Sequence, residues 1–190
     1  MTRRRPVPLA DLQRPAPEVA PTLLGKLLVS TVDGVVVAGR ITEVEAYTED
    51  DPASHTFTGR TDRNEVMFGR AGRLYVYLSY GIHRCVNVVT GPVDRGEAVL
   101  IRALDLVEGT DVARSRRGGR PDRELTNGPG KLGAALGIDL DHDGVDALSP
   151  AAPLRLLDDG TPRPTRPLVG PRIGIKKGVD TPWRFRTPPR

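Results

Sequence analysis

Glycine and proline interrupt this chain so often that a fold built on long helices is excluded. Of its 190 residues, 21 are glycine and 18 are proline. Inside a helix, glycine costs about 1 kcal/mol and proline about 3 kcal/mol relative to alanine, so neither a long helical bundle nor a coiled coil can form. The apolar segments between these residues are short and bounded by turn signals, which is typical of strands. We therefore predict a mixed α+β fold with a largely antiparallel sheet.

The length and the cysteine content narrow the class of protein further. A chain of 190 residues fits one domain, which we place at residues 17–190, after a loose, proline-rich arm at residues 1–16. A single cysteine excludes a disulfide framework and a zinc site built on several thiolates. The sequence has no run of 18 apolar residues and no secretory signal. We expect a cytoplasmic protein with no membrane partner.

The predicted elements are short strands joined by turns, with few helical segments. Asp33-Gly34 is a strong hairpin signal, and Tyr80-Gly81 joins a second pair of strands. We predict strands at residues 26–32, 35–47, 74–80, 83–89, 98–104, 153–158, 169–175 and 183–186. We predict helical segments at residues 18–24, 106–116 and 127–137, and a long ordered loop with a helical turn at residues 49–73.

The positive charge is concentrated in three places. The net charge is +4, and basic residues gather at positions 3–5, 114–123 and 163–190. Such patches attract polyanions through counterion release, which suggests a nucleic-acid partner. A surface of solvated arginines explains the same pattern, so charge alone leaves both interpretations open.

The aromatic residues indicate where a site lies. All four tyrosines fall between Tyr47 and Tyr80. Side chains alternate between the two faces of a strand, so polar and aromatic side chains gather on one face of three predicted strands. These sets are Ile41, Glu43, Glu45 and Tyr47 on the strand at residues 35–47, Tyr75 and Tyr77 on the strand at 74–80, and His83, Cys85 and Asn87 on the strand at 83–89. Carboxylates beside aromatic planes suit a pocket for a flat heterocycle with a general base at its edge. An ordinary solvated sheet face is the alternative.

Seven segments carry a resemblance to a known family. They are RITEVEAY (40–47), DPASH (51–55), TDRNEVMF (61–68), LYVYLSYGIHRCVNVV (74–89), AVLIRAL (98–104), NGPGKL (127–132) and VGPRIGI (169–175). In this order and spacing the chain resembles bacterial members of the 3-methyladenine (alkyladenine) DNA glycosylase family. The resemblance runs from about residue 23 to residue 185. It implies a curved, mostly antiparallel sheet with a protruding β-hairpin and short flanking helices.

The resemblance also implies a reaction. Members of this family flip alkylated or deaminated purines out of duplex DNA, because the glycosidic bond of a stacked base is out of reach. They hydrolyse that bond and leave an abasic site, with no metal, no cofactor and no covalent intermediate. The matching motifs make Glu45 the general base that activates water, with Arg102 close to that water. No lysine stands beside Glu45 in the motif, so we expect a monofunctional enzyme without strand cleavage.

The substrate-binding residues follow from the same motifs. The resemblance implies that Tyr47 stacks on one face of the flipped base and that His55 and Tyr77 lie on the other. Asn87 matches a residue that crowds the purine 2-amino group and so disfavours normal guanine. We expect 3-methyladenine as a substrate, with hypoxanthine and ethenoadenine as further candidates.

The remaining expected contacts involve the DNA duplex. Tyr80 matches the side chain that intercalates where the base has left, and Gly81 allows the tight turn beside it and approaches the DNA backbone. Lys131 and Arg172 are expected to contact phosphates. We expect the partner to be double-stranded DNA that contains damaged purines, and the protein to act as a monomer.

Several alternatives stay open at this stage. A non-catalytic damaged-DNA-binding protein would use the same scaffold without needing Glu45, and a hydrolase of free nucleosides would have no use for Tyr80. Glu43 either assists Glu45 or forms a structural ion pair, and we favour the ion pair. Residues 139–144 open like an EF-hand loop but are interpreted as an acidic turn, and Cys85 is interpreted as a packed thiol.

Overall fold

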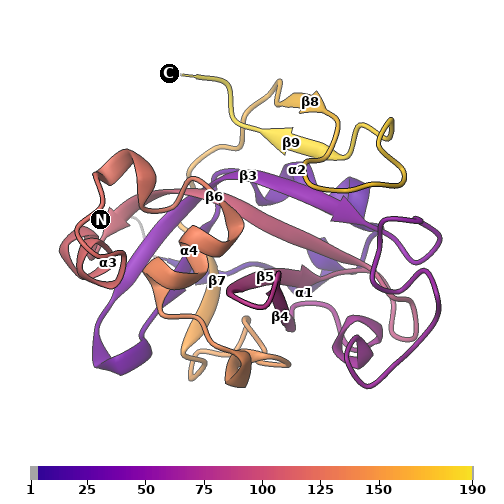
Figure 1. Cartoon of the computed structure of the whole chain (residues 1–190), viewed down its shortest axis with the longest axis horizontal. Coiled ribbons are helices and arrows are strands. Elements are labelled where there is room, and N and C mark those ends of the chain that lie inside the picture. The colour runs from indigo at the N-terminus through magenta and orange to yellow at the C-terminus, as the bar shows by residue number, and fades with distance from the viewer. Residues whose placement is uncertain (1–3, 190) are drawn as a thin grey trace.

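A computed structural model describes residues 4–189 and shows one curled antiparallel sheet with short helices (Figure 1). The strands follow the order β1-β7-β2-β3-β6-β5-β4, and β9 pairs with both β3 and β8. Every described strand pair is antiparallel. The predicted α+β class and the largely antiparallel sheet are confirmed. Within the described part of the chain, no helix is long and apolar enough to cross a membrane.

The elements are short, as the spacing of glycine and proline predicts. The strands are β1 (Arg5–Pro6), β2 (Leu27–Ser30), β3 (Val37–Tyr47), β4 (Leu74–Ser79), β5 (His83–Val89), β6 (Ala98–Glu108), β7 (Leu154–Asp158), β8 (Leu168–Gly170) and β9 (Arg184–Arg186). The α-helices are α1 (Leu9–Leu12), α2 (Ala16–Leu23), α3 (Thr110–Arg116) and α4 (Pro129–Leu136). Single 3₁₀ turns lie at Val32–Gly34, Glu65–Phe68, Asp122–Glu124 and Leu140–His142.

The long pair β3–β6 forms the centre of the sheet and contains three irregularities in register, two of which lie next to Glu43. Ile41 pairs with Leu104 and Glu43 with Ala103, so Thr42 is skipped on β3. The next pair is Val44 with Ile101, so Arg102 is skipped on β6. A bulge leaves one residue unpaired and redirects nearby side chains. The sequence places Ile41 on the same face as Glu43, and this is wrong, because the bulge turns Ile41 into the same apolar cluster as Val44.

The main hydrophobic core lies on one face of the sheet. Val44, Val86 and Ile101 belong to this cluster, together with the buried faces of α2 and α4. Helix α2 packs against β3 and β6, and α4 packs against β5 and β6. Helix α4 approaches β5 so closely that a Cβ at Gly133 would lie 2.2 Å from the carbonyl oxygen of Arg84. The side chains on the opposite face of β3, β6, β5 and β4 do not belong to this cluster.

The N-terminal segment differs from the expected loose arm. Residues 5–12 form β1 and α1, and β1 pairs with β7. Leu12 is fully buried in the main core, and the backbone N–H of Ala16 donates to Glu97 Oε2 over 2.8 Å. Apolar side chains spaced between the prolines find partners in the core, which anchors this segment. Residues 1–3 of the expected arm lie outside the described residues.

Other boundaries also differ from the sequence analysis. Strand β6 extends to Glu108, so the helix expected from residue 106 begins only at Thr110. The strand expected at residues 169–175 is limited to β8, and the residues after Gly170 form a loop over the end of β3. This loop and β9 lie along β3 (Figure 1), and they complete the site described next.

Candidate active site

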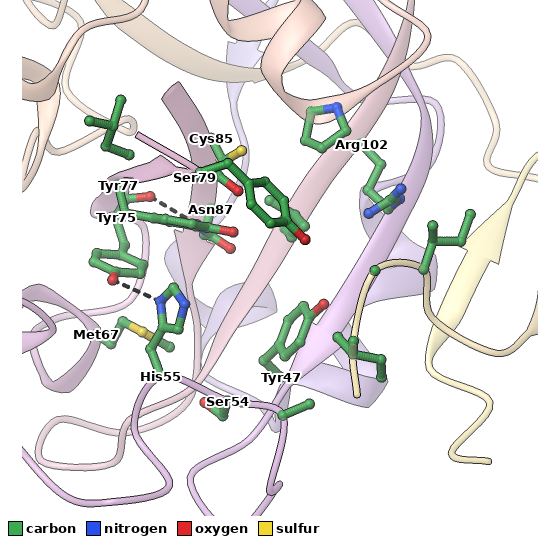
Figure 2. A pocket seen from close by; sticks show the side chains of 18 of the residues that line it. Tyr47, Ser54, His55, Met67, Tyr75, Tyr77, Ser79, Cys85, Asn87 and Arg102 are labelled. Atoms are coloured by element: carbon green, nitrogen blue, oxygen red, sulfur yellow. Dashed lines mark hydrogen bonds between the residues drawn. The ribbon is translucent and has the colours of Figure 1, made fainter. Parts of the chain in front are cut away.

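A cavity of about 610 Å³ opens on the face of the sheet opposite the main core. Its walls come from the end of β3, the loop at residues 52–55, the β4–β5 hairpin and the loop at residues 173–177. Figure 2 shows Tyr47 and Arg102 on one side of this space, and His55, Tyr75 and Tyr77 on the other. A cavity of this size suits a single heterocyclic group.

The wall opposite Tyr47 is a packed group of three rings. Tyr75 and Tyr77 are stacked, with ring centroids 5.5 Å apart and planes 21° apart. The ring of His55 meets Tyr77 edge-on at 4.6 Å, and its Nδ1 lies 2.9 Å from the Tyr75 hydroxyl. Burial, and then the positive charge of Arg63, lower the pKa of His55. Burial raises the pKa of Tyr75 to about 12, so this wall is uncharged at neutral pH.

The floor of the cavity contains Cys85 and Asn87 from β5. Asn87 is buried, and its Nδ2 donates to the carbonyl oxygen of Tyr75 over 3.0 Å. That bond fixes the direction of the amide. Burial raises the pKa of the Cys85 thiol, so it is protonated at neutral pH. The structure therefore brings the expected base-binding residues together around one space.

Glu45 lies directly behind this cavity and has no exposed surface. Its Oε2 accepts from the Tyr47 hydroxyl over 2.8 Å and from Arg102 Nη1 over 3.2 Å. Its Oε1 accepts from the backbone N–H of Ile173 over 2.8 Å. Burial and then the Glu45 charge raise the pKa of Tyr47, which keeps that hydroxyl a donor. Three donors thus replace the water that a buried carboxylate loses.

Arg102 connects two carboxylates. Its Nε donates to Glu43 Oε1 over 2.9 Å, while its Nη1 reaches Glu45. Arg184 from β9 adds a longer contact to Glu43, with 3.8 Å between Nε and Oε1. Arg102 is the residue of β6 that has no partner in the β3–β6 register, and from this position its side chain reaches both Glu43 and Glu45. Glu43 thus forms an ion pair, the role that the sequence analysis favours for it.

Two contributors to this site are absent from the sequence analysis. The Ile173 N–H is a backbone donor, and a backbone donor has no side-chain signature. Arg63 lies within TDRNEVMF, yet its position at the cavity depends on the fold of the loop that carries it. The quoted motifs contain both residues without assigning a role to either.

The expected phosphate contact of Arg172 does not fit the structure. Its side chain has no exposed surface, and the guanidinium forms a bidentate ion pair with Asp51. A group enclosed in this way has no donor to offer to DNA. Lys131 is half-buried, and its Nζ donates to Asn127 Oδ1 over 2.8 Å, near the start of α4.

The β4–β5 hairpin projects an exposed tyrosine beside the cavity. Tyr80 is 86% exposed and lies at the tip of the hairpin, where Gly81 follows it. Both residues have positive φ, 51° and 73°, and a left-handed conformation is uncommon for tyrosine. The predicted turn is thus present, and it holds the Tyr80 ring away from the body of the protein.

Three cations surround the mouth of the cavity. Arg63, Lys176 and Lys177 line it and are exposed. None of the three forms an ion pair with another residue between 4 and 189. These cations are available to an anionic partner. In the described part of the chain, no three His, Cys, Asp or Glu side chains form a metal-binding group.

The acidic turn at residues 139–144 lies apart from this site. Leu140–His142 form a 3₁₀ turn that Asp139 caps, and Asp139 also pairs with Arg84 over 3.1 Å. The Asp139 carboxylate thus bonds to groups of the protein itself.

The chain is similar to proteins of one known family. The model of the family described as Methylpurine-DNA glycosylase (MPG) matches residues 10–189. A protein of Nocardia farcinica is 51% identical over 176 residues, which cover 88% of this chain and 82% of that protein. A protein of Burkholderia orbicola is 48% identical over 184 residues, with coverage of 96% and 87%, and one of Methanoculleus marisnigri is 47% identical over 182 residues, with coverage of 94% and 93%.

Each of these three relatives bears the name "Putative 3-methyladenine DNA glycosylase". The family match and the relatives confirm the resemblance that the seven sequence segments carry. The chain belongs to the methylpurine-DNA glycosylase family and is a DNA glycosylase, a hydrolase of N-glycosyl bonds.

Proposed function

We propose that this glycosylase is monofunctional and removes damaged purines that it flips out of duplex DNA. The substrates are alkylated or deaminated purines, 3-methyladenine first, with hypoxanthine and ethenoadenine as further candidates. The observation that carries the proposal is the position of Glu45, a buried carboxylate held by three donors directly behind an aromatic cavity.

Glu45 is proposed to activate the attacking water. Each carboxylate oxygen has two acceptor positions, and Oε1 uses one of them for the Ile173 N–H. A water at the second position would transfer a proton to Glu45 while its oxygen attacks C1′ of the sugar. The bond between C1′ and the purine nitrogen then breaks, and its electron pair leaves with the base. Arg102 holds the carboxylate in place and stabilises its negative charge.

The aromatic walls support binding of a flat, electron-poor base. A purine between Tyr47 and the His55–Tyr77 wall would contact π-faces, which attract a positively charged alkylated ring. Because burial lowers the pKa of His55, the imidazole is neutral and does not repel that charge. Its ring nitrogen not bonded to Tyr75 remains available to the edge of a base.

The exposed features around the cavity support binding to duplex DNA rather than to free nucleosides. The exposure of Tyr80 at the hairpin tip supports its entry into the duplex where the base has left. The exposed cations Arg63, Lys176 and Lys177 at the cavity mouth support phosphate contacts beside the flipped nucleotide. Lys131, near the start of α4, is a further candidate for a phosphate contact. We propose that a monomer suffices, because all of these groups come from one chain.

The test is single-turnover release of 3-methyladenine, hypoxanthine and ethenoadenine from duplex DNA by the wild type and Glu45→Gln. A general base contributes about 10²–10⁴-fold, so we expect the variant to bind an abasic-site analogue normally and to release base at least about 100-fold more slowly. If Glu45→Gln keeps the wild-type rate, Glu45 is not the base. If the wild type binds lesion DNA but releases nothing, the chain acts as a damaged-DNA-binding protein.

A further inference from the structure

We infer that the buried ion pair between Arg172 and Asp51 is a positioning clasp. It holds the Glu45 carboxylate and both walls of the base cavity in fixed relative positions. This inference rests on the proposed role of Glu45. Arg172 and Asp51 expose 0% and 2% of their side chains, and both guanidinium Nη atoms bond to the carboxylate. A pair this enclosed cannot touch DNA, so its contribution must reach the reaction through its neighbours.

The first neighbour is the donor to Glu45. Ile173 follows Arg172 directly, and its N–H donates to Glu45 Oε1 over 2.8 Å. The Arg172 guanidinium also donates to the carbonyl oxygen of Ala46, the residue after Glu45, over 3.0 Å. The carboxylate and its backbone donor therefore lie on two segments that the Arg172 side chain joins.

The second neighbour is Tyr47. The centre of the guanidinium lies 4.7 Å from the Tyr47 ring centroid and 5.4 Å from that of Trp183. Tyr47 lines the cavity whereas Arg172 does not, so the guanidinium supports the ring from behind. The N–H of Ala46 also donates to the carbonyl oxygen of Trp183 over 2.9 Å, which fastens the same strand end a second time.

The third neighbour is the loop that carries His55. Asp51 Oδ1 accepts from the N–H of Ala53 over 3.0 Å, and its carbonyl oxygen accepts from the N–H of Ser54 over 2.8 Å. His55 follows directly and forms part of the wall opposite Tyr47. Arg172 also reaches the carbonyl oxygen of Gly178 over 3.2 Å, which fixes the far end of the loop at residues 173–177. One ion pair thus holds three parts of the site.

The structure offers a matched control pair on β3, the strand that carries Glu45. Arg40 on β3 forms a bidentate pair with Asp159, at 2.8 and 3.2 Å, and these side chains are 18% and 17% exposed. Neither residue lines the cavity. Arg40→Lys and Asp159→Asn therefore report what loss of a bidentate pair does to stability alone.

The experiment compares Arg172→Lys and Asp51→Asn with these two controls. Asp51→Asn keeps the size of the side chain and serves if Arg172→Lys fails to fold. Single-turnover release of 3-methyladenine, Kd for an abasic-site duplex and thermal stability are measured for each. A displacement of about 1 Å at a reacting group costs up to about 100-fold in rate, so we expect the clasp variants to slow release by about 10–100-fold with Kd within about threefold of wild type.

Trp183 supplies a local readout, because it is the only tryptophan in the chain. Its emission should change in the clasp variants and not in the Arg40 and Asp159 controls. The inference is overturned if the clasp variants release base at the wild-type rate, or if controls of equal stability loss are slowed as much. Glu45→Gln separates the two proposals: if it is inactive while the clasp variants are unaffected, only the clasp is wrong, and if it is fully active, the proposed base is wrong.

Discussion

The two faces of strands β3, β6, β5 and β4 use the same backbone for different purposes. One face carries Val44, Val86 and Ile101 into the main hydrophobic core. The other carries Glu45, Asn87 and the tyrosines of β4 around a cavity. Burial of apolar side chains stabilises the core face, and this effect does not depend on the direction of each contact. The cavity face buries charge, which is tolerated only when each polar group meets a partner at the right distance.

The cavity face accounts for a deviation from regular strand pairing. Arg102 lies at a register irregularity, and from there it reaches both Glu43 and Glu45. Ile101, its neighbour in the chain, remains in the core. The bulge therefore redirects a side chain on the cavity face while the core face keeps its packing. Substitutions on the two faces should accordingly have separable effects.

A substitution on the core face should test this separation most strongly. Ile101→Ala should lower the free energy of unfolding by about 2–5 kcal/mol, because it leaves a cavity in a packed core. The single-turnover rate of the folded fraction should stay at the wild-type value. Urea denaturation and excision assays well below the unfolding midpoint check this. A rate loss that parallels the stability loss would show that the two faces are not independent.

The next effect concerns the hairpin tip, where the cavity face meets solvent. Tyr80→Asn removes the ring but keeps a residue that tolerates positive φ. Stacking is worth about 1–3 kcal/mol, so Kd for lesion duplex should rise roughly 5- to 150-fold with thermal stability unchanged. Val93→Ala, at an apolar side chain that is 61% exposed and does not line the cavity, is the control. Equal binding by both variants would remove Tyr80 from the DNA interface.

The smallest effect tests the neutral wall of the cavity. The unfolded chain titrates His55 near its ordinary pKa of 6.5, and burial lowers this pKa in the folded state. As pH falls below 6.5 the unfolded state therefore binds more protons, and stability is lost. Between pH about 7.5 and about 5, the Tm of the wild type should therefore fall further than that of His55→Gln, by a small margin because His55 is partly exposed to solvent. Identical pH profiles would mean that His55 titrates alike in both states.

Local patterns predicted much of the fold and of the site. Asp33-Gly34 and Tyr80-Gly81 mark turns that the structure contains, with positive φ at all four residues. The alternation of side chains placed Glu43 and Glu45 on one face of a strand and Tyr75 and Tyr77 on one face of another, and the structure brings these faces to one cavity. Such features depend on neighbours in the chain, so a single sequence contains them.

Other features depend on residues that are distant in the chain. The loose arm expected at residues 1–16 was wrong for residues 4–16, because Leu12 packs against a core that only the folded chain provides. The face assigned to Ile41 was wrong because the register irregularities arise from the pairing of β3 with β6.

The strand-rich class, the hairpin with an exposed tyrosine and the family could all be predicted from the sequence, the family through seven motifs in consistent order and spacing. The burial of Arg172 against Asp51, more than one hundred positions away in the chain, and the bond from the Ile173 N–H to Glu45 could be seen only in the folded chain. The role of a charged group depends on whether water or a partner surrounds it. Arginine has the same chemistry in both settings, and only the fold determines which setting Arg172 has.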